Sequence, residues 1–133
     1  MDQHDLALEL LQLGADDLLA ATVLARSREI RDTIIGFHCQ QAAEKSLKAV
    51  LADGGIDYPK THNLLVLTNL LKAAGHESPI ATEDLAKLNP YAVARRYDAA
   101  ELHGLDRASA LDLAGRVQTW ADEQIRGPDS GPG

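Results

Sequence analysis

Apolar residues in the first part of the chain recur at helical intervals. The main set is Leu6, Leu10, Leu13, Leu18 and Val23, and a second set is Leu11 and Leu19. Residues three or four positions apart share one side of an α-helix, whereas a half-buried strand would alternate strictly. We therefore expect a first helix over residues 6–24 that buries this broad stripe against neighbouring helices.

Two further helices follow in the first half. Residues 30–51 keep helical apolar spacing and favour a second helix, which should end at the glycine pair that comes after it. After a short loop, Thr61 is placed to cap a third helix that continues until Gly75. His62 and Asn63 would then lie in its first turn.

The second half of the chain predicts shorter elements and one long helix. Thr82 begins a short helix that Pro90 should interrupt, because proline disfavours helical geometry in the residue before it. Residues 92–102 are expected to resume helical geometry. A final helix over residues 106–125 has apolar positions at helical intervals.

These elements predict an all-α fold, an up-and-down bundle of four to five helices. A chain of 133 residues is long enough for one compact core and too short for two ordinary domains. We expect one helical domain over residues 1–126. Residues 127–133 are mostly glycine and proline, and we expect them to form a flexible tail.

Composition narrows the cellular setting. No apolar stretch is long enough to cross a bilayer, and the acidic start at Asp2 does not resemble a secretory signal, so we expect a cytoplasmic protein without a membrane contact. The single cysteine, Cys39, lies inside a helical pattern and has no partner for an internal disulfide. Because metal-ligating residues are not clustered at suitable spacing, we expect neither a metal site nor another cofactor.

The net charge of −7 opposes non-specific coating of nucleic acid, since such binding depends on lysine and arginine. The charge is uneven, however. The first helix is rich in acid, with Asp2, Asp5, Glu9, Asp16 and Asp17. The cations come later, at Arg26, Arg28, Arg31, Lys45, Lys48, Lys60, Arg95 and Arg96. A local basic cleft is therefore compatible with the acidic total.

The segment 37–49, Phe-His-Cys-Gln-Gln-Ala-Ala-Glu-Lys-Ser-Leu-Lys-Ala, carries the most informative polar pattern. On a helix, His38, Gln41, Lys45 and Lys48 share one polar face. Such a face can contact phosphate or a protein partner. The alternative is a solvated helix side with one Glu-Lys pair worth about 0.3–0.5 kcal/mol.

This stretch resembles the signature of the HEPN domain family, Phe-His-x-Gln-Gln-Ala-x-Glu-Lys-x-Leu-Lys-Ala. The downstream run 59–64, Pro-Lys-Thr-His-Asn-Leu, is similar to the family's Pro-Lys-Thr-His-Asp-Leu, and residues 94–97 are similar to its Ala-x-Arg-Tyr element. Order and spacing agree over residues 5–125. The resemblance implies an up-and-down helical bundle, often a homodimer, that works with a minimal nucleotidyltransferase, in some cases as a toxin-antitoxin pair.

The resemblance also implies candidate catalytic residues. Catalytic members of the wider family cleave RNA without a metal ion through an Arg-x4-6-His motif at the dimer interface, and six residues separate Arg96 from His103. Histidine titrates near neutrality and can move a proton, while arginine can hold the scissile phosphate. The alternative is that Arg96 and His103 are two exposed residues near a helix end.

Further residues are candidates for binding RNA or a nucleotide. Lys60 and His62 stand near a helix start, where backbone N–H groups favour anions, and Arg95 and Tyr97 flank Arg96. A structural role for His62 is the alternative. Three functions remain open: a HEPN module that acts with a nucleotidyltransferase, an active endoribonuclease toxin, and a non-catalytic scaffold that binds another protein.

Overall fold

The computed structural model describes residues 2–78, 80–93 and 105–127 of the 133-residue chain. It contains α1 (Gln3–Leu24), α2 (Asp32–Asp53), α3 (Leu64–Ala73), α4 (Thr82–Ala86), the 3-10 helix η1 (Asn89–Val93) and α5 (Arg107–Arg126). The described residues form no strand. The expected all-α bundle is confirmed.

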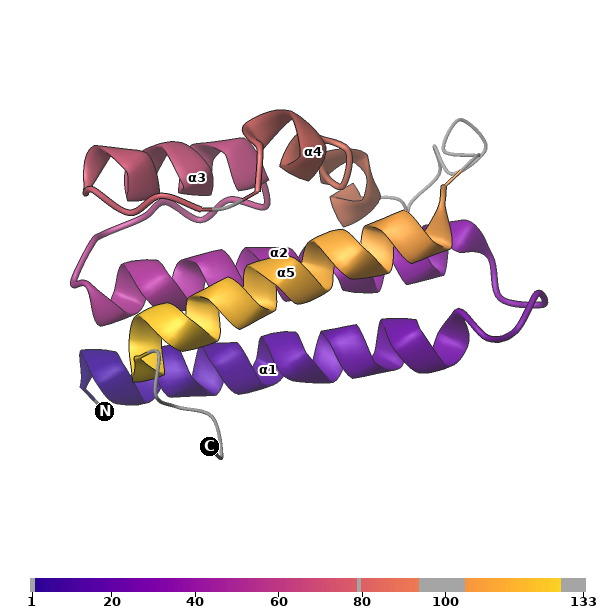
Figure 1. The fold of residues 1–133 in the computed structure, drawn as a ribbon, viewed down its shortest axis with the longest axis horizontal. Coiled ribbons are helices and arrows are strands. Elements are labelled where there is room, and N and C mark those ends of the chain that lie inside the picture. Colours follow the sequence, from indigo (N-terminus) through magenta and orange to yellow (C-terminus); the bar gives the residue numbers. More distant parts are fainter. Residues whose placement is uncertain (1, 79, 94–104, 128–133) are drawn as a thin grey trace.

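Helix α2 is the centre of the bundle. It packs between α1 and α5 on one side and α3 and η1 on the other, as Figure 1 shows. The first two helices run antiparallel, so the loop between them lies at the end of the bundle where α5 begins (Figure 1). The start of α1 and the end of α5 lie together at the opposite end (Figure 1).

Helix α2 contributes more residues to the core than any other element, and most of them have small or branched side chains. Its fully buried residues include Ile35, Cys39, Leu47 and Leu51, each with 0% exposure. Burying a leucine or isoleucine side chain contributes about 1.5–3 kcal/mol relative to exposure. Where α1 crosses α2, a Cβ at Gly14 would lie 3.2 Å from the Ala42 carbonyl oxygen, so this glycine permits close approach of the two helices.

The predicted apolar stripe of α1 is wrong in part. Four of its members are 40–63% exposed: Leu6, Leu13, Leu19 and Val23. The buried residues of α1 are Leu11, which the prediction included, and Ala7, Gly14 and Ala21, which it did not. Close contact with α2 and α5 requires small side chains on the inner face of α1, and the apolar arc around this helix is wider than the surface that its two neighbours cover.

The predicted start of α3 is also wrong. Asn63, not Thr61, is the capping residue, because its Oδ1 accepts a hydrogen bond from the Leu65 N–H at 2.9 Å. The Leu64 N–H donates to Asn89 Oδ1 at 2.9 Å, so η1 supplies a second cap from a distant part of the chain. His62 therefore precedes the helix and does not lie in its first turn.

The other boundaries differ from expectation by a few residues. The first helix begins at Gln3, because Asp2 accepts a hydrogen bond from the Asp5 N–H. The second helix spans Asp32–Asp53, two positions later than predicted. Pro90 lies inside η1, and the expected continuation over 92–102 falls outside the described residues after position 93.

The last helix agrees with the prediction closely. Asp106 caps α5 by accepting a hydrogen bond from the Ser109 N–H, and the helix ends at Arg126 before Gly127 with φ of 88°. The remainder of the predicted tail, residues 128–133, lies outside the described residues. Within the described chain, none of the helices combines the length and apolarity that a bilayer crossing needs.

Candidate functional site

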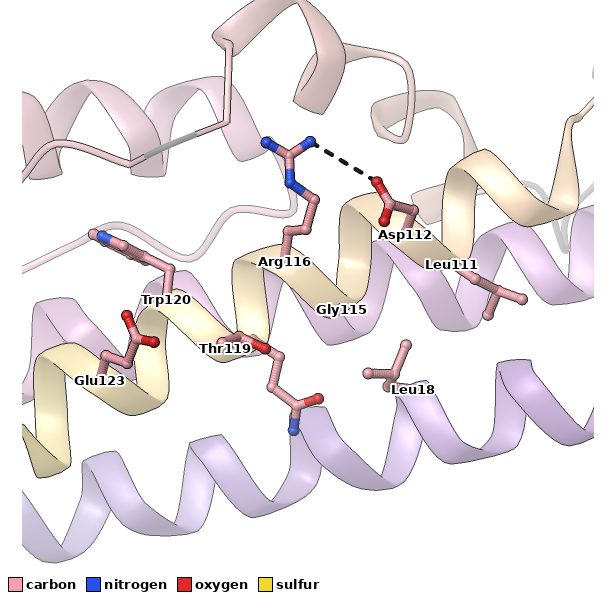
Figure 2. A pocket seen from close by; sticks show the side chains of 9 residues that line it. Leu18, Leu111, Asp112, Gly115, Arg116, Thr119, Trp120 and Glu123 are labelled. Carbon is pink, nitrogen blue, oxygen red and sulfur yellow. Dashed lines mark ion pairs between the residues drawn. The ribbon is translucent and has the colours of Figure 1, made fainter. Parts of the chain in front are cut away.

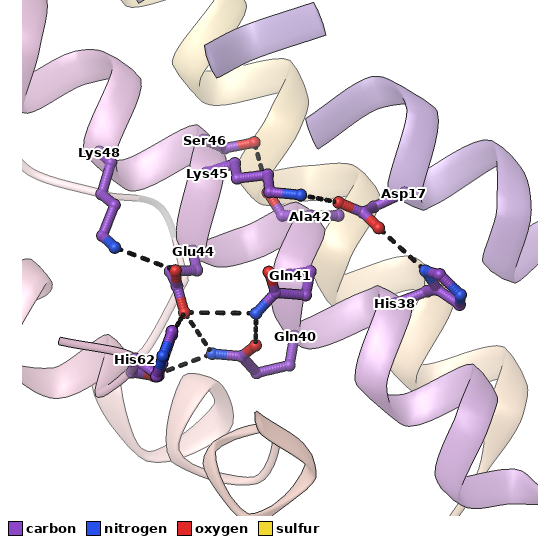
Figure 3. A network of polar contacts seen from close by, with 10 residues as sticks. All are labelled: Asp17, His38, Gln40, Gln41, Ala42, Glu44, Lys45, Ser46, Lys48 and His62. Atoms are coloured by element: carbon purple, nitrogen blue, oxygen red, sulfur yellow. Dashed lines mark hydrogen bonds and ion pairs between the residues drawn. The ribbon is translucent and has the colours of Figure 1, made fainter. Parts of the chain in front are cut away.

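Two carboxylates organise the polar side chains that α2 presents (Figure 3). The first is Asp17 of α1, whose Oδ2 accepts a hydrogen bond from Lys45 Nζ at 2.6 Å and whose Oδ1 lies 2.9 Å from His38 Nδ1. The Asp17 side chain is only 13% exposed. We call Asp17, His38 and Lys45 the Asp17 cluster; it joins α1 to α2.

The second carboxylate is Glu44 of α2, which is 5% exposed. Lys48 Nζ lies 3.0 Å from Glu44 Oε2, and His62 Nδ1 lies 2.9 Å from Oε1. Two glutamine amides also donate to Oε1, Gln40 at 3.1 Å and Gln41 at 3.4 Å. We call these five residues the Glu44 cluster (Figure 3).

The surroundings of Glu44 favour its ionised form. Burial raises the pKa of this carboxyl, but hydrogen bonds from Gln40, Lys48 and His62, together with the charge of Lys48, outweigh burial and lower the pKa below its ordinary value of 4.5. At neutral pH the carboxylate is therefore negatively charged. It fixes the positions of one cation and one imidazole.

The Glu44 cluster presents His62 to solvent. The His62 side chain is 66% exposed, whereas Lys48 is 16% exposed. The His62 backbone is held as well, because its carbonyl accepts a hydrogen bond from Gln40 Nε2 at 2.8 Å. Lys48 Nζ also lies 5.8 Å from the centre of the Tyr58 ring, a cation–π distance.

This arrangement suits an anionic ligand or a proton transfer. With Nδ1 of His62 turned to Glu44, the outer nitrogen Nε2 has no protein partner among the described residues. A carboxylate partner fixes the orientation of an imidazole, whose other nitrogen can then donate to or accept from a ligand. Lys48 compensates the charge of Glu44, so protonation of His62 makes the cluster net positive.

The sequence-predicted binding residues on α2 fall into two groups. His38 and Lys45 belong to the Asp17 cluster, and Gln41 and Lys48 belong to the Glu44 cluster with His62. Lys60 is exposed and has no ion pair within the described chain. The remaining predicted residues, Arg95, Arg96, Tyr97 and His103, lie outside the described residues.

Sequence reasoning missed the organising role of the two carboxylates. The Glu44–Lys48 pair was visible as an i, i+4 spacing, but burial of Glu44 depends on α3 and its preceding segment, which supply His62. Asp17 appeared only as part of the acidic load of α1. Its contacts with His38 and Lys45 join residues 21 and 28 positions apart, which no local spacing indicates.

A cavity of about 420 Å³ lies between η1 and α5. Lys87, Tyr91, Leu105 and Asp106 are among its lining residues. Burial and the nearby Asp32 raise the pKa of Tyr91, so its hydroxyl stays protonated at neutral pH. Its lining residues come from both sides, in the sequence, of the segment 94–104, which contains Arg96 and His103 and lies outside the described residues.

A larger open groove of about 550 Å³ follows α1 and α5 (Figure 2). Leu18, Leu111 and Trp120 supply apolar surface, while Asp112 and Arg116 form an ion pair at 3.8 Å. Both charged side chains of that pair are about half exposed or more, and such pairs contribute little. The groove therefore has less convergent chemistry than the Glu44 cluster.

Cys39 does not add a nucleophile. It is fully buried, and burial raises the pKa of its thiol to about 12. The reactive thiolate is therefore scarce at neutral pH. A search of the described residues for groups of three or more His, Cys, Asp or Glu side chains that could hold a metal ion finds none.

Comparison with known proteins gives one match. A family model described as the HEPN domain matches residues 7–124, which include most of α1, both carboxylate clusters, the segment 94–104 and most of α5. No curated protein matches the chain, and no solved structure matches it.

Proposed function

Because the chain belongs to the HEPN domain family, we propose that it is a helical module that binds the phosphate of a nucleotide or an RNA at the Glu44 cluster. In this proposal it acts as a homodimer beside a minimal nucleotidyltransferase, in a toxin-antitoxin pair. Both the signature helix and the downstream histidine that this family match covers contribute to the cluster.

The observation that carries the proposal is the contrast in exposure within the Glu44 cluster. A 5% exposed carboxylate holds an imidazole that is 66% exposed. Glu44 Oε1 lies 2.9 Å from His62 Nδ1, and His62 Nε2 has no protein partner among the described residues, so this outer nitrogen is available to a ligand. The exposed Lys60, two positions before His62, supplies positive charge for a phosphate.

The exposed leucines of α1 support the partner part of the proposal. Leu6, Leu13, Leu19 and Val23 place apolar surface in water on one helix, and exposed apolar surface is typical of protein contacts. Light scattering of the purified protein tests the homodimer. Co-expression with a minimal nucleotidyltransferase, followed by size-exclusion chromatography, tests the second contact; a monomer that elutes alone would contradict both.

The decisive experiment measures binding of ATP by isothermal titration calorimetry. His62→Gln keeps a hydrogen bond to Glu44 but removes the titratable ring, and we expect roughly tenfold weaker binding, the loss of one charge-assisted hydrogen bond. The matched control is His4→Gln, because His4 pairs with Asp53 at the same 2.9 Å distance elsewhere on the surface. Equal affinity in the two variants would reject the Glu44 cluster as the phosphate site.

The second candidate function is metal-independent RNA cleavage by Arg96 and His103. Its support is the family match, which spans both residues, and the cavity beside Tyr91 and Leu105 at the ends of their segment. The test is cleavage of labelled RNA without metal by the wild type, Arg96→Ala and His103→Ala. Cleavage that survives both substitutions would exclude these residues, and absence of both binding and cleavage would leave the protein-scaffold function.

A further inference from the structure

The loop between α1 and α2 carries three exposed arginines. We call residues 25–31 the arginine loop; its cations are Arg26, Arg28 and Arg31. None of the three has an ion pair within the described chain. The acidic residue of the loop, Glu29, is also exposed, so the loop keeps a net charge of two positive units.

Arg107 holds this loop from the start of α5. Its Nη1 donates to the carbonyl oxygens of Ala25 at 3.0 Å and Ser27 at 2.8 Å, and its Nη2 donates to that of Ile30 at 2.5 Å. Its Nε donates to Asp32 Oδ1 at 2.7 Å, which compensates the charge of Arg107 itself. Arg107 thus fixes the loop backbone without using the three exposed arginines.

The contacts of Arg107 alternate with the exposed cations. Each carbonyl that it binds belongs to the residue directly before an arginine, at positions 25, 27 and 30. The peptide group before each exposed arginine is therefore hydrogen-bonded to Arg107, while the side chain of that exposed arginine extends into solvent. A loop ordered in this way loses less backbone entropy on binding a ligand than a free loop would.

The acidic residues of α1 do not cancel this charge. Glu9 lies 17 positions before Arg26 in a helix that rises 1.5 Å per residue, so the two are about 25 Å apart. That distance exceeds the Debye length of about 8 Å at physiological salt. Nearer to the loop, Asp17 is already paired with His38 and Lys45. Asp16 lies ten positions before Arg26, about 15 Å along the helix, which also exceeds the Debye length.

We propose that the arginine loop binds successive phosphates of a single RNA strand at the end of the bundle where α5 begins. Three separate guanidinium groups suit a polyanion better than one small phosphate ligand, and arginine binds phosphate oxygens through two parallel hydrogen bonds. The loop is held by a residue two positions after Leu105, where the segment containing Arg96 and His103 rejoins the described chain. This inference rests on the RNA-binding part of the proposed function.

The test compares two triple variants that change the net charge equally. One variant replaces Arg26, Arg28 and Arg31 by glutamine. The control variant also places glutamine at three cations, Lys72, Arg116 and Arg126, which lie on α3 and α5 away from the loop. Binding of a fluorescent single-stranded oligoribonucleotide is measured by anisotropy over a series of salt concentrations. The catalytic candidates are left intact in both variants.

We expect the loop variant to bind the RNA at least tenfold more weakly than the control variant. We also expect its plot of log affinity against log salt to be shallower by about 2, because a single strand releases about 0.7 counterion per phosphate contact. Equal affinity and equal slope for the two variants would overturn the inference while RNA binding by the protein stands. If the loop variant loses RNA binding and His62→Gln keeps it, the inference holds and the Glu44 cluster is rejected as the RNA-binding site.

Binding of ATP separates the remaining outcomes. A wild-type protein that binds ATP but not the oligoribonucleotide would overturn the arginine loop as an RNA contact and leave nucleotide binding at the Glu44 cluster. A wild-type protein that binds neither would overturn both proposals. Circular dichroism of each variant confirms that the exposed substitutions leave the helices intact.

Discussion

Glu44 and His62 pair a nearly buried carboxylate with an exposed imidazole across 2.9 Å. They belong to different elements, α2 and the segment before α3, so the pair joins the central helix to the layer that covers it. The same carboxylate also holds Lys48. One buried charge therefore serves both the packing of the bundle and the proposed phosphate site.

Glu44 should make the stability of the protein sensitive to acid. A carboxyl whose pKa is lowered by folding contributes stability above its unfolded value of 4.5, and this contribution is lost as the pH falls through the folded pKa. Glu44→Gln should lower the free energy of unfolding by about 1–3 kcal/mol at pH 7, since it leaves Lys48 without its charge partner. Urea unfolding should show that the difference in free energy of unfolding between wild type and variant shrinks below pH 4.5. A difference that stays constant with pH would contradict this account.

Arg107 should control access to the arginine loop. Arg107→Lys keeps the charge, but one ammonium group cannot reach the four acceptors that the guanidinium binds. We therefore expect the free energy of unfolding to fall by about 2–4 kcal/mol. Trypsin should then cleave after the exposed loop arginines much faster than in the wild type. Arg126→Lys is the control, because Arg126 pairs only with Asp122 near the exposed end of α5. Similar cleavage of both variants would refute the role of Arg107.

Gly36 should tolerate no side chain. A Cβ at this position would lie 2.6 Å from Cγ of Tyr91, so Gly36→Ala must displace the Tyr91 ring and should lower the free energy of unfolding by about 1–3 kcal/mol. Gly115→Ala on α5 should have the opposite effect, because its Cβ would meet only Leu18 at 3.9 Å and alanine favours a helix by about 0.5–1 kcal/mol. The midpoint of thermal unfolding should therefore fall for Gly36→Ala and rise for Gly115→Ala.

Cys39 should be inert in the folded protein. Its thiol is fully buried and has a pKa raised to about 12, so a thiol reagent at pH 8 should react only on unfolding. The absorbance change with a disulfide reagent should be slow in buffer and immediate in guanidinium chloride. Fast reaction in buffer would show that α2 opens locally at this position.

The helices could be predicted from the sequence because each one depends on residues that are close together along the chain. The spacing of Val117 and Trp120 predicts α5 without knowledge of its neighbours. The inner face of α1 was not accessible, since its apolar arc is wide and only the positions of α2 and α5 decide which part is covered. Leu19 is 63% exposed for that reason, although its pattern is that of a core residue.

The candidate site was predictable in part for the same reason. The signature on α2 indicated His38, Gln41, Lys45 and Lys48, but not that two carboxylates would divide them. The hydrogen bond from the Leu64 N–H to Asn89 Oδ1, which supplies the second cap of α3, joins residues 25 positions apart. Contacts of this kind depend on how helices pack, which periodicity does not report.

The reach of Arg107 has a consequence for the order of folding. Its acceptors lie 75 to 82 positions earlier in the chain, so the turn between the first two helices lacks its hydrogen-bond donor until the last helix arrives. Helices α1 and α2 can pair early through nearby contacts, whereas a pairing of such sequence separation pays a larger loop-closure entropy. We therefore expect the hydrogen bonds within the turn, from the Arg26 N–H to Val23 and from the Ser27 N–H to Leu24, to be protected late in pulse-labelled hydrogen exchange, after the amides of α1 and α2.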